Sequence, residues 1–476
     1  MLLRTKVAIL CIACLVVLWL NWLRGDALEN TESGYKPPKL DLSKLNPLPK
    51  RPIIGSDGTR LDSRKPRAAF VMLAREVELD ALLKTIREVQ MAFNGEKHAR
   101  YPYILLSDPG LPFSPWFRSK VKAVASSAGV EARFAEIPKE HWDIPSWIDQ
   151  TRMYEGFKKM KAGGMLYGDS LSYRKMCRYQ SGFFWRHPML DNLDYYWRLE
   201  PGVKYPCDMR RRDPFRFMRD NGKKYGFVIT IKESPGTIKT LWVSSTAATE
   251  WINTHKHLIP ADNSLRFVAK PHMNAYNKVS RSVPHFEIAD LSLWRSQAYQ
   301  SFWAHLDAAG GTFYERWGDA PVHSIAASML LNRNEIHYFE DIGYFHNPIH
   351  HCPRSRKDAA RCACDPHQSF DYDKFGISCQ REWDALQGIN STDVILRINE
   401  AEGIRGWGEY AGAPDGWGQD EDVKTLGGKE SKQAEKSQTA PAAAAAAAVQ
   451  PWSGGLKGDV RLDDEGKPMK AKPLRP

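Results

Sequence analysis

The chain has 476 residues, 42% of them hydrophobic and 26% charged, which is enough apolar material to bury a sizeable core. Its formal net charge of +11 is dispersed, and the one tight basic cluster in its body is Arg210–Arg212, so a nucleic-acid-binding protein is disfavoured. The globular part contains no G-x-G-x-x-G, P-loop, H-E-x-x-H or G-x-S-x-G motif. Dinucleotide dehydrogenases, P-loop NTPases, zincins and α/β-hydrolases are disfavoured for that reason.

The first apolar segment, residues 7–23, carries no charge and is just long enough to span a hydrocarbon core roughly 30 Å thick. Arg4 and Lys6 precede it, so the positive-inside bias places residues 1–6 in the cytosol and the rest in a lumen. A cleaved signal peptide is the alternative, but no clean small-x-small cleavage site follows the apolar run. The sequence therefore predicts one uncleaved transmembrane signal anchor.

The segments on either side of the predicted globular region have a different composition. Residues 24–65 are polar and proline-rich, which is typical of an extended stem. Residues 406–476 contain a run of alanines and few large apolar side chains, and we expect them to form a disordered tail. Residues 66–405 remain as one predicted lumenal domain.

This domain begins with alternating strand and helix patterns. Ala69–Ala74 suits a buried strand, and apolar residues from Leu79 to Phe93 lie on one face of a predicted helix. Tyr101–Leu106 and Val130–Ile137 are the next predicted strands, with another helical stretch between them. Such alternation indicates parallel βαβ units, with ligands expected at the carboxyl ends of the strands.

Later segments are rich in aromatic residues. Strands are predicted at Tyr195–Arg198 and Phe227–Ile231. One helix is expected to start soon after Asp290 and to end at Gly310-Gly311. Another is expected to begin near Pro321, because proline suits the first turn of a helix, and to run through Leu330.

Two features agree with a lumenal location. Asn390-Ser391-Thr392 is a glycosylation sequon, although such triplets also arise by chance. An even number of cysteines lies beyond the anchor, which permits up to three disulfides whose pairing stays open. The C-x-C spacing of Cys362 and Cys364 is wrong for a usual zinc knuckle, so zinc is disfavoured. The six cysteines are Cys177, Cys207, Cys352, Cys362, Cys364 and Cys379.

Four polar residues stand within aromatic or apolar sequence, where burial is costly unless the group is paired or bound to a metal. Glu200 directly follows a strand and precedes Pro-Gly, so it is either a cation ligand or a turn cap. Glu287 lies between apolar residues. Asp319 either caps the next helix or belongs to a site. His346 follows an aromatic run and is either structural or a ligand.

Several long motifs resemble glycosyltransferase family 15, the fungal Golgi α-1,2-mannosyltransferases, over residues 68–400. They are YGDSLSYRKMCRYQSGFF, YYWRLEPGVKYPCD, FEIADLSLWRS, GGTFYERWGDAPVHSIAASMLL and HYFEDIGYFHNPIHHCP. The resemblance implies a GT-A-like fold, with a Rossmann-like mixed sheet flanked by helices, behind a type II anchor in the Golgi membrane. It also implies GDP-mannose as donor, Mn²⁺ as cofactor, retention of configuration, and a mannose-terminated N-glycan, O-mannosyl glycan or mannoprotein as acceptor.

The resemblance assigns roles to individual residues. Glu200 and His346 would be the Mn²⁺ ligands, with His323 as a second choice. Glu287 would be a nucleophile beside the anomeric carbon, and both double displacement and front-face attack stay open. Asp319 would belong to the sugar site. The expected donor- or acceptor-binding residues are Arg75, Tyr167, Tyr173, Arg198 and Asp319.

One segment departs from the family pattern. Asn277–His285 lacks the cysteine and tryptophan that family members carry there, which leaves acceptor specificity open. A mannan-binding lectin of the secretory pathway and a wall or Golgi scaffold are the alternatives from other functional classes. The intact acids favour the enzyme, because binding alone would not require Glu287.

Overall fold

The structure is a computed structural model, and all residues it describes belong to one compact unit of the chain. They are residues 65–233, 235–242, 246–268, 281–282, 286–347, 349–366, 369 and 378–389. The predicted anchor at 7–23, the sequon at Asn390 and the predicted tail at 406–476 lie outside them. Among the described residues, none of the helices is both long and apolar enough to cross a membrane.

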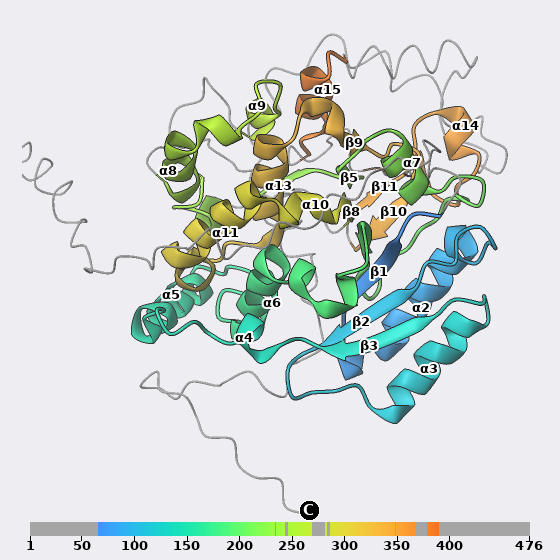
Figure 1. The fold of residues 1–476 in the computed structure, drawn as a ribbon, viewed down its shortest axis with the longest axis horizontal. Coiled ribbons are helices and arrows are strands. Elements are labelled where there is room, and N and C mark those ends of the chain that lie inside the picture. The colour runs from blue at the N-terminus through green and yellow to red at the C-terminus, as the bar shows by residue number, and fades with distance from the viewer. Residues whose placement is uncertain are drawn as a thin grey trace, which may run out of the picture. The chain divides into compact units, whose positions relative to one another are not determined.

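A seven-stranded mixed sheet forms the centre of the fold, in the order β3-β2-β1-β4-β8-β5-β9 (Figure 1). Every neighbouring pair is parallel except those of β8, which runs antiparallel to both β4 and β5. The first residue of β8 therefore lies at the edge where β4 ends. The strands are β1 (Ala68–Leu73), β2 (Tyr103–Ser107), β3 (Ala132–Glu136), β4 (Tyr195–Arg198), β5 (Tyr225–Phe227), β8 (Glu287–Asp290) and β9 (Ile336–Tyr338).

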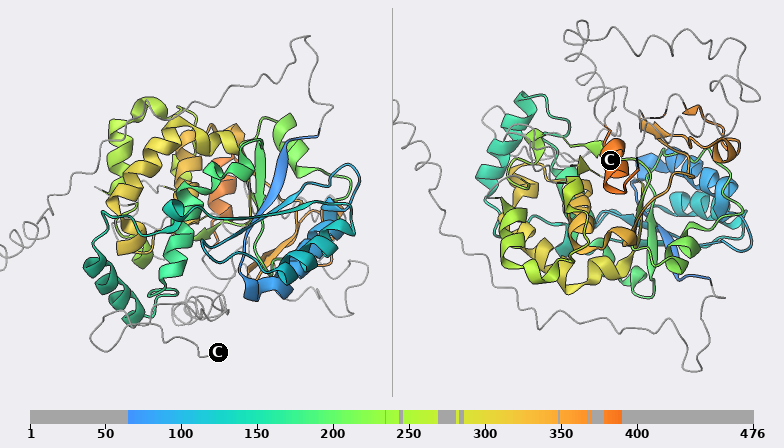
Figure 2. Two further views of the ribbon diagram at one scale, coloured as in Figure 1. Left: turned by 60° about the horizontal axis from the view of Figure 1, so that its bottom comes forward. Right: turned by 90° about the horizontal axis from the view of Figure 1, so that it is seen from above.

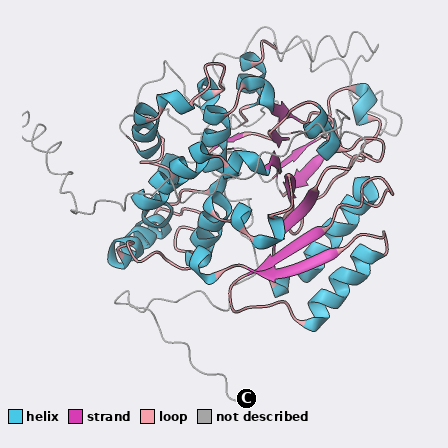
Figure 3. Cartoon of the chain, viewed as in Figure 1, coloured by secondary structure: helices cyan, strands magenta, loops and turns pink. Residues whose placement is uncertain are grey.

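Helices cover both faces of the sheet (Figures 2 and 3), and β1, which is covered on both sides, is apolar and buried throughout. Phe70 and Met72 of β1 pack with the helices of one face, while Ala69 and Val71 belong to the core on the other. The first face carries α2 (Leu79–Val89) and α3 (Pro115–Ser126). The second carries α6 (Leu171–Gly182), α10 (Leu291–Arg295), α11 (Gln297–Ala309) and α13 (Asp319–Leu330).

Shorter elements surround this sandwich. Two small antiparallel pairs are formed by β6 (Ile231–Lys232) with β7 (Arg281–Ser282) and by β10 (Tyr344–His346) with β11 (Ile349–His351). The remaining α-helices of the described residues are α4 (Lys139–Trp142), α5 (Gln150–Ala162), α7 (Pro214–Asp220), α8 (Ala247–Thr254), α9 (Leu265–Val268), α12 (Gly311–Tyr314), α14 (Arg356–Ala359) and α15 (Gln380–Leu386).

Three predicted elements differ from the structure. The prediction of one strand over Phe227–Ile231 is wrong, because β5 ends at Phe227 and β6 begins only at Ile231 in another pair. The helix expected after Asp290 is broken at Ser296, whose hydroxyl caps α11 by accepting a hydrogen bond from the Tyr299 N–H. The helix expected near Pro321 begins two residues earlier, at Asp319.

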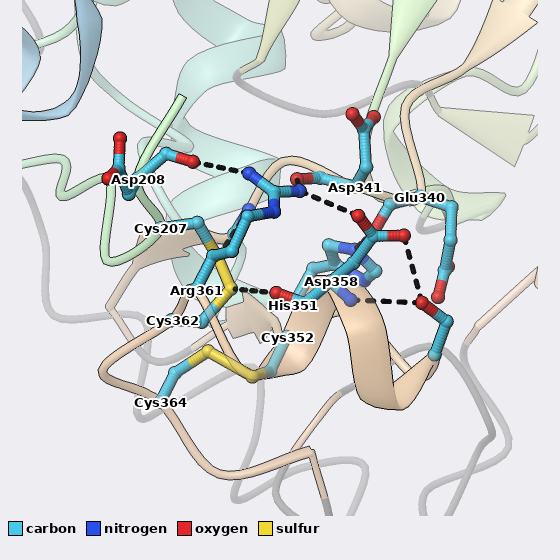
Figure 4. The surroundings of a disulfide bond; sticks show 12 residues. Cys207, Asp208, Glu340, Asp341, His351, Cys352, Asp358, Arg361, Cys362 and Cys364 are labelled. Carbon is cyan, nitrogen blue, oxygen red and sulfur yellow. Dashed lines mark hydrogen bonds and ion pairs between the residues drawn. A yellow bond between two sulfur atoms is a disulfide. The ribbon is translucent and has the colours of Figure 1, made fainter. Parts of the chain in front are cut away.

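Four of the six cysteines form two adjacent disulfides, Cys207–Cys362 and Cys352–Cys364 (Figure 4). The other two, Cys177 and Cys379, are buried and form no disulfide with another described residue, so two of the three permitted disulfides are present within the described residues. The sulfurs of Cys207, Cys362 and Cys364 lie within 4.8 Å of one another because the two bonds are neighbours. These bonds occupy the thiolates that a zinc ion would need, in agreement with the disfavoured zinc interpretation.

Candidate active site

Glu200 stands at the carboxyl edge of the sheet, two residues beyond the end of β4. The chain turns sharply after it through Gly202, whose φ of 94° is accessible mainly to glycine. Thr85 of α2 fixes this turn, because its hydroxyl accepts from the Gly202 N–H at 2.9 Å and donates to the Val203 carbonyl at 3.1 Å. The Glu200 carboxylate is thus held in a defined position.

His346 is brought to Glu200 by backbone pairing between two distant segments. Lys204 and Phe345 exchange N–H···O bonds of 2.9 and 3.0 Å. As a result, the Nε2 atom of His346 lies 3.5 Å from a carboxylate oxygen of Glu200, and both side chains are about 22–23% exposed. A carboxylate and an imidazole that keep access to solvent are a suitable donor set for Mn²⁺, so these two residues fit the predicted ion.

Arg198 is a buried cation between two carboxylates. It is 5% exposed, it donates from Nη1 to Asp319, and its Nε atom lies 3.6 Å from Glu200. Asp319 is the first residue of α13, and the helix cap itself is Gly318, which makes no side-chain capping bond. Asp319 therefore holds Arg198 in place rather than serving as the N-cap residue.

Glu287 faces Arg198 across the antiparallel β4–β8 pair and is only 2% exposed. One of its oxygens accepts a hydrogen bond from the Tyr196 hydroxyl, and the other accepts from Tyr225 at 3.0 Å and contacts Nδ1 of His323 at 2.7 Å. Burial alone would raise the pKa of Glu287. The charges of His323 and Arg198 and the hydrogen bonds outweigh burial and lower the pKa to about 2. The carboxylate is therefore a stably held anion.

His323, the second choice for a metal ligand, lies against Glu287 and not in the Glu200–His346 pair. It is fully buried, and its ring stacks on Trp294 with centroids 4.2 Å apart. This stacking fixes the plane of the imidazole. His323 therefore orients Glu287.

Tyr167 and Tyr173 lie together, with their rings stacked at 4.5 Å. Tyr167 has a φ of 56°, and the buried Arg174 supports this unusual backbone by donating to the carbonyls of Tyr167 and Gly168, both at 2.8 Å. The guanidinium of Arg316 lies 5.4 Å from the centre of the Tyr173 ring. The aromatic pair is therefore rigid and carries a cation beside it.

Arg75 follows β1, the strand next to β4, and lies at the same edge of the sheet as Glu200. Its guanidinium pairs with Glu78 at 3.1 Å. The structure thus places Arg75, Arg198, Glu200, Glu287 and Asp319 along the carboxyl edge of the β1–β4 pair and the start of β8. Asn390, the predicted glycosylation site, lies outside the described residues.

Several residues that contact the candidate site residues were not singled out from the sequence. Tyr196 shares a strand face with Arg198 because side chains two residues apart point the same way, so the period of the strand could have indicated it. Tyr225 carries no comparable signal, because its strand has only three residues. Arg316 belongs to the quoted GGTFYERWGDAP motif but contacts the aromatic pair only through the fold.

A comparison with known protein families identifies the family of this chain. The model of the glycolipid 2-alpha-mannosyltransferase family matches residues 38–388. The chain belongs to this family. It is 40% identical over 382 residues to the alpha-1,2 mannosyltransferase KTR1 of Saccharomyces cerevisiae, covering 80% of this chain and 86% of that relative. It is 42% identical over 319 residues to the O-glycoside alpha-1,2-mannosyltransferase omh1 of Schizosaccharomyces pombe, covering 67% and 78%.

Solved structures share the fold. The core-mannan synthase A of Aspergillus fumigatus, solved in an Mn/GDP form, superposes with a TM-score of 0.62 at 34% identity, covering 68% of this chain and 86% of that one. The mannosyltransferase Ktr4p of S. cerevisiae, solved in complex with GDP, gives a TM-score of 0.64 at 29% identity, covering 76% and 89%.

Loss of either candidate ligand should weaken metal binding. Glu200→Ala removes an anionic ligand, and His346→Ala removes a neutral one, so we expect both variants to lose Mn²⁺-dependent GDP binding, with Glu200→Ala losing more. Calorimetric titration of Mn²⁺ in the presence of GDP measures this. Normal titration curves in both variants would show that the two residues are structural and do not bind the metal.

Removal of the Glu287 charge should affect turnover. Glu287→Gln keeps the shape of the side chain, and we expect turnover to fall by on the order of 10³-fold, with little change in donor affinity. Steady-state kinetics measures both quantities, and thermal melting must accompany them because the group is buried. A loss confined to affinity would assign Glu287 to donor positioning.

Proposed function

We propose that this chain transfers mannose from GDP-mannose to a mannose-terminated acceptor in α-1,2 linkage, with retention of configuration. The observation that carries the proposal is the Glu200–His346 pair at the carboxyl edge of the sheet, beside the buried Arg198. Membership of the family and its relatives with α-1,2-mannosyltransferase names support the reaction type. The Mn/GDP form of one solved relative supports the donor class and the metal.

We assign some residues of the site to the diphosphate of the donor and others to its sugar. Glu200 and His346 would hold Mn²⁺, which supplies neutralisation of the departing diphosphate. Asp319 and Arg198, which form a buried ion pair, would border the sugar on the α13 side of the site. Tyr167 and Tyr173 offer an aromatic surface of the kind that packs on the apolar face of a sugar.

Glu287 is better placed for electrostatic stabilisation than for covalent attack. Both of its oxygens already accept hydrogen bonds from Tyr196, Tyr225 and His323, and the side chain is almost fully buried. A nucleophile needs a free oxygen in contact with the anomeric carbon. A fixed anion behind the sugar instead stabilises an oxocarbenium-like transition state. We therefore favour front-face attack over double displacement.

The GT-A-like fold, the membrane anchor and the Golgi location are part of the same proposal. The mixed sheet, with its candidate metal-binding carboxylate just past β4, supports a GT-A-like fold. Residues 7–23 would anchor the enzyme in the Golgi membrane as a single-pass type II protein with a lumenal catalytic domain. The disulfides of the domain agree with an oxidising compartment.

Incubation of the full-length chain in detergent with GDP-mannose, Mn²⁺ and α-methyl-mannoside tests the activity. We expect a disaccharide whose new bond is α-1,2, as determined by NMR, and no product after chelation of the metal. The Glu200→Ala variant is the matched inactive control. Binding of mannoside without product would instead support a mannan-binding lectin.

The proposed topology makes Asn390 lumenal. We expect endoglycosidase treatment of the intact protein to increase its mobility, and the shift to vanish in Asn390→Gln, because the sequon would be the modified site. Electrophoresis of both proteins measures this. A mature N-terminus near residue 26 would contradict the uncleaved anchor.

A further inference from the structure

β3 is the outermost strand at one side of the sheet, and among the described residues its outer edge pairs with no other strand (Figure 1). The N–H of Tyr103 in β2 donates to the carbonyl of Glu131, so Glu131 and every second residue after it face β2. Because successive residues of a parallel strand direct their backbone groups to opposite sides, Ala132 and Phe134 direct theirs away from the sheet. This edge can accept a further extended segment.

A groove of about 730 Å³ lies beside this edge, between the exposed side of α3 and the start of β3. Arg118 of α3 leans over β3, with its guanidinium 5.8 Å from the centre of the Phe134 ring, and Lys122 lines the groove one turn further along the helix. Among the described residues neither cation forms an ion pair. α3 contains no acid, and Glu131 in the groove is paired with Arg133 at 2.7 Å. The groove is therefore open and positively charged.

The predicted tail contains one segment whose charge and spacing match this groove. Residues 417–423 (WGQDEDV) carry three consecutive acids and no basic residue. In an extended strand, Asp420 and Asp422 lie on one face about 6.6 Å apart. Arg118 and Lys122 are four residues apart on a helix, which corresponds to a rise of about 6 Å. The two carboxylates can therefore meet the two cations in register.

The segment is long enough to reach the groove, and other occupants fit it less well. Asp420 follows Ile389, the last described residue, by about 30 residues, which span about 100 Å when extended. A domain of this size has a diameter of only about 50 Å. The proline-rich residues 24–65 contain more basic than acidic side chains. Pairing of β3 with β3 of a second copy would bring two basic helices together, which like charges oppose.

We propose that residues 417–423 dock within the same chain on the edge of β3, as an added strand whose carboxylates pair with Arg118 and Lys122. In recognition by strand addition, main-chain hydrogen bonds supply affinity and side chains set the register. Attachment to the same chain supplies a local concentration on the order of 1 mM, so a weak contact suffices. The inference does not depend on the proposed function, because it uses none of the residues assigned to mannose transfer.

Hydrogen exchange of the full-length chain in detergent tests the inference at the outward-facing amides of Ala132 and Phe134. We expect these amides to exchange on the order of 10-fold more slowly in the natural chain than in Asp420→Asn/Asp422→Asn, because docking protects both of them. Salt at about 1 M should also speed their exchange in the natural chain, since it screens charges more than about 3 Å apart.

Two double variants show whether the effect is specific to the groove. Arg118→Glu/Lys122→Glu removes the two cations from α3, and the two amides should then exchange as fast as in the tail variant. Glu430→Gln/Glu435→Gln removes two acids elsewhere in the tail and is the matched control. We expect it to keep the slow exchange of the natural chain, because these acids lie outside the docking segment.

Exchange of charges between the partners identifies the contact. A chain that combines Arg118→Glu/Lys122→Glu with Asp420→Lys/Asp422→Lys should regain slow exchange, because each pair is restored with opposite signs. Equal rates in the natural chain and Asp420→Asn/Asp422→Asn would overturn the inference, and so would a lack of recovery in the charge-exchanged chain. Exchange that slows as the protein concentration rises would assign the edge to a second copy and overturn it as well.

Discussion

The guanidinium of Arg198 is buried among carboxylates, and the geometry of the site depends on this one cation. Taking a charge out of water costs several kcal/mol unless partners compensate it. Burial lowers the pKa of Arg198, but Asp319, Glu287 and Glu200 together raise it well above its usual value. These carboxylates come from α13, β8 and the loop after β4. The charge balance therefore fixes three segments of the chain relative to one another, and the buried guanidinium of Arg198 would be destabilising without these carboxylates.

The expectation that site residues follow the carboxyl ends of parallel strands predicted part of this arrangement. It failed at β8, the strand that runs antiparallel to its neighbours. Arg75 and Glu200 follow β1 and β4, which are parallel neighbours. Parallel strands of this kind can be recognised in the sequence, because their apolar runs alternate with helical patterns. Glu287 instead begins its strand, and it reaches the same edge because β8 is antiparallel. Its place between apolar residues marked it as a candidate, but its catalytic role was expected only from the family resemblance. Strand direction is decided by long-range pairing, which no local pattern encodes.

Other contacts depend on packing that sequence patterns do not express. The stacking of His323 on Trp294 places an imidazole against Glu287, whereas the sequence left His323 as an alternative metal ligand. The break at Ser296 was missed because apolar periodicity continues across it, although a serine followed by a helical run is a capping signal. Disulfide pairing was open in principle, since six cysteines allow 15 connectivities for three bonds.

The two disulfides couple the candidate metal ligands to the redox state of their surroundings. Cys207 lies in the chain segment that leaves Glu200, and Cys352 directly follows the hairpin that carries His346. The Cys207–Cys362 bond closes a loop with a sequence separation of 155, which restricts the unfolded chain strongly. In a reducing medium, the Lys204–Phe345 backbone bonds and the ring contact of Tyr205 with Tyr344 would still join the two segments, but without a covalent link. The spacing of the candidate ligand pair is therefore most constrained in the oxidised chain.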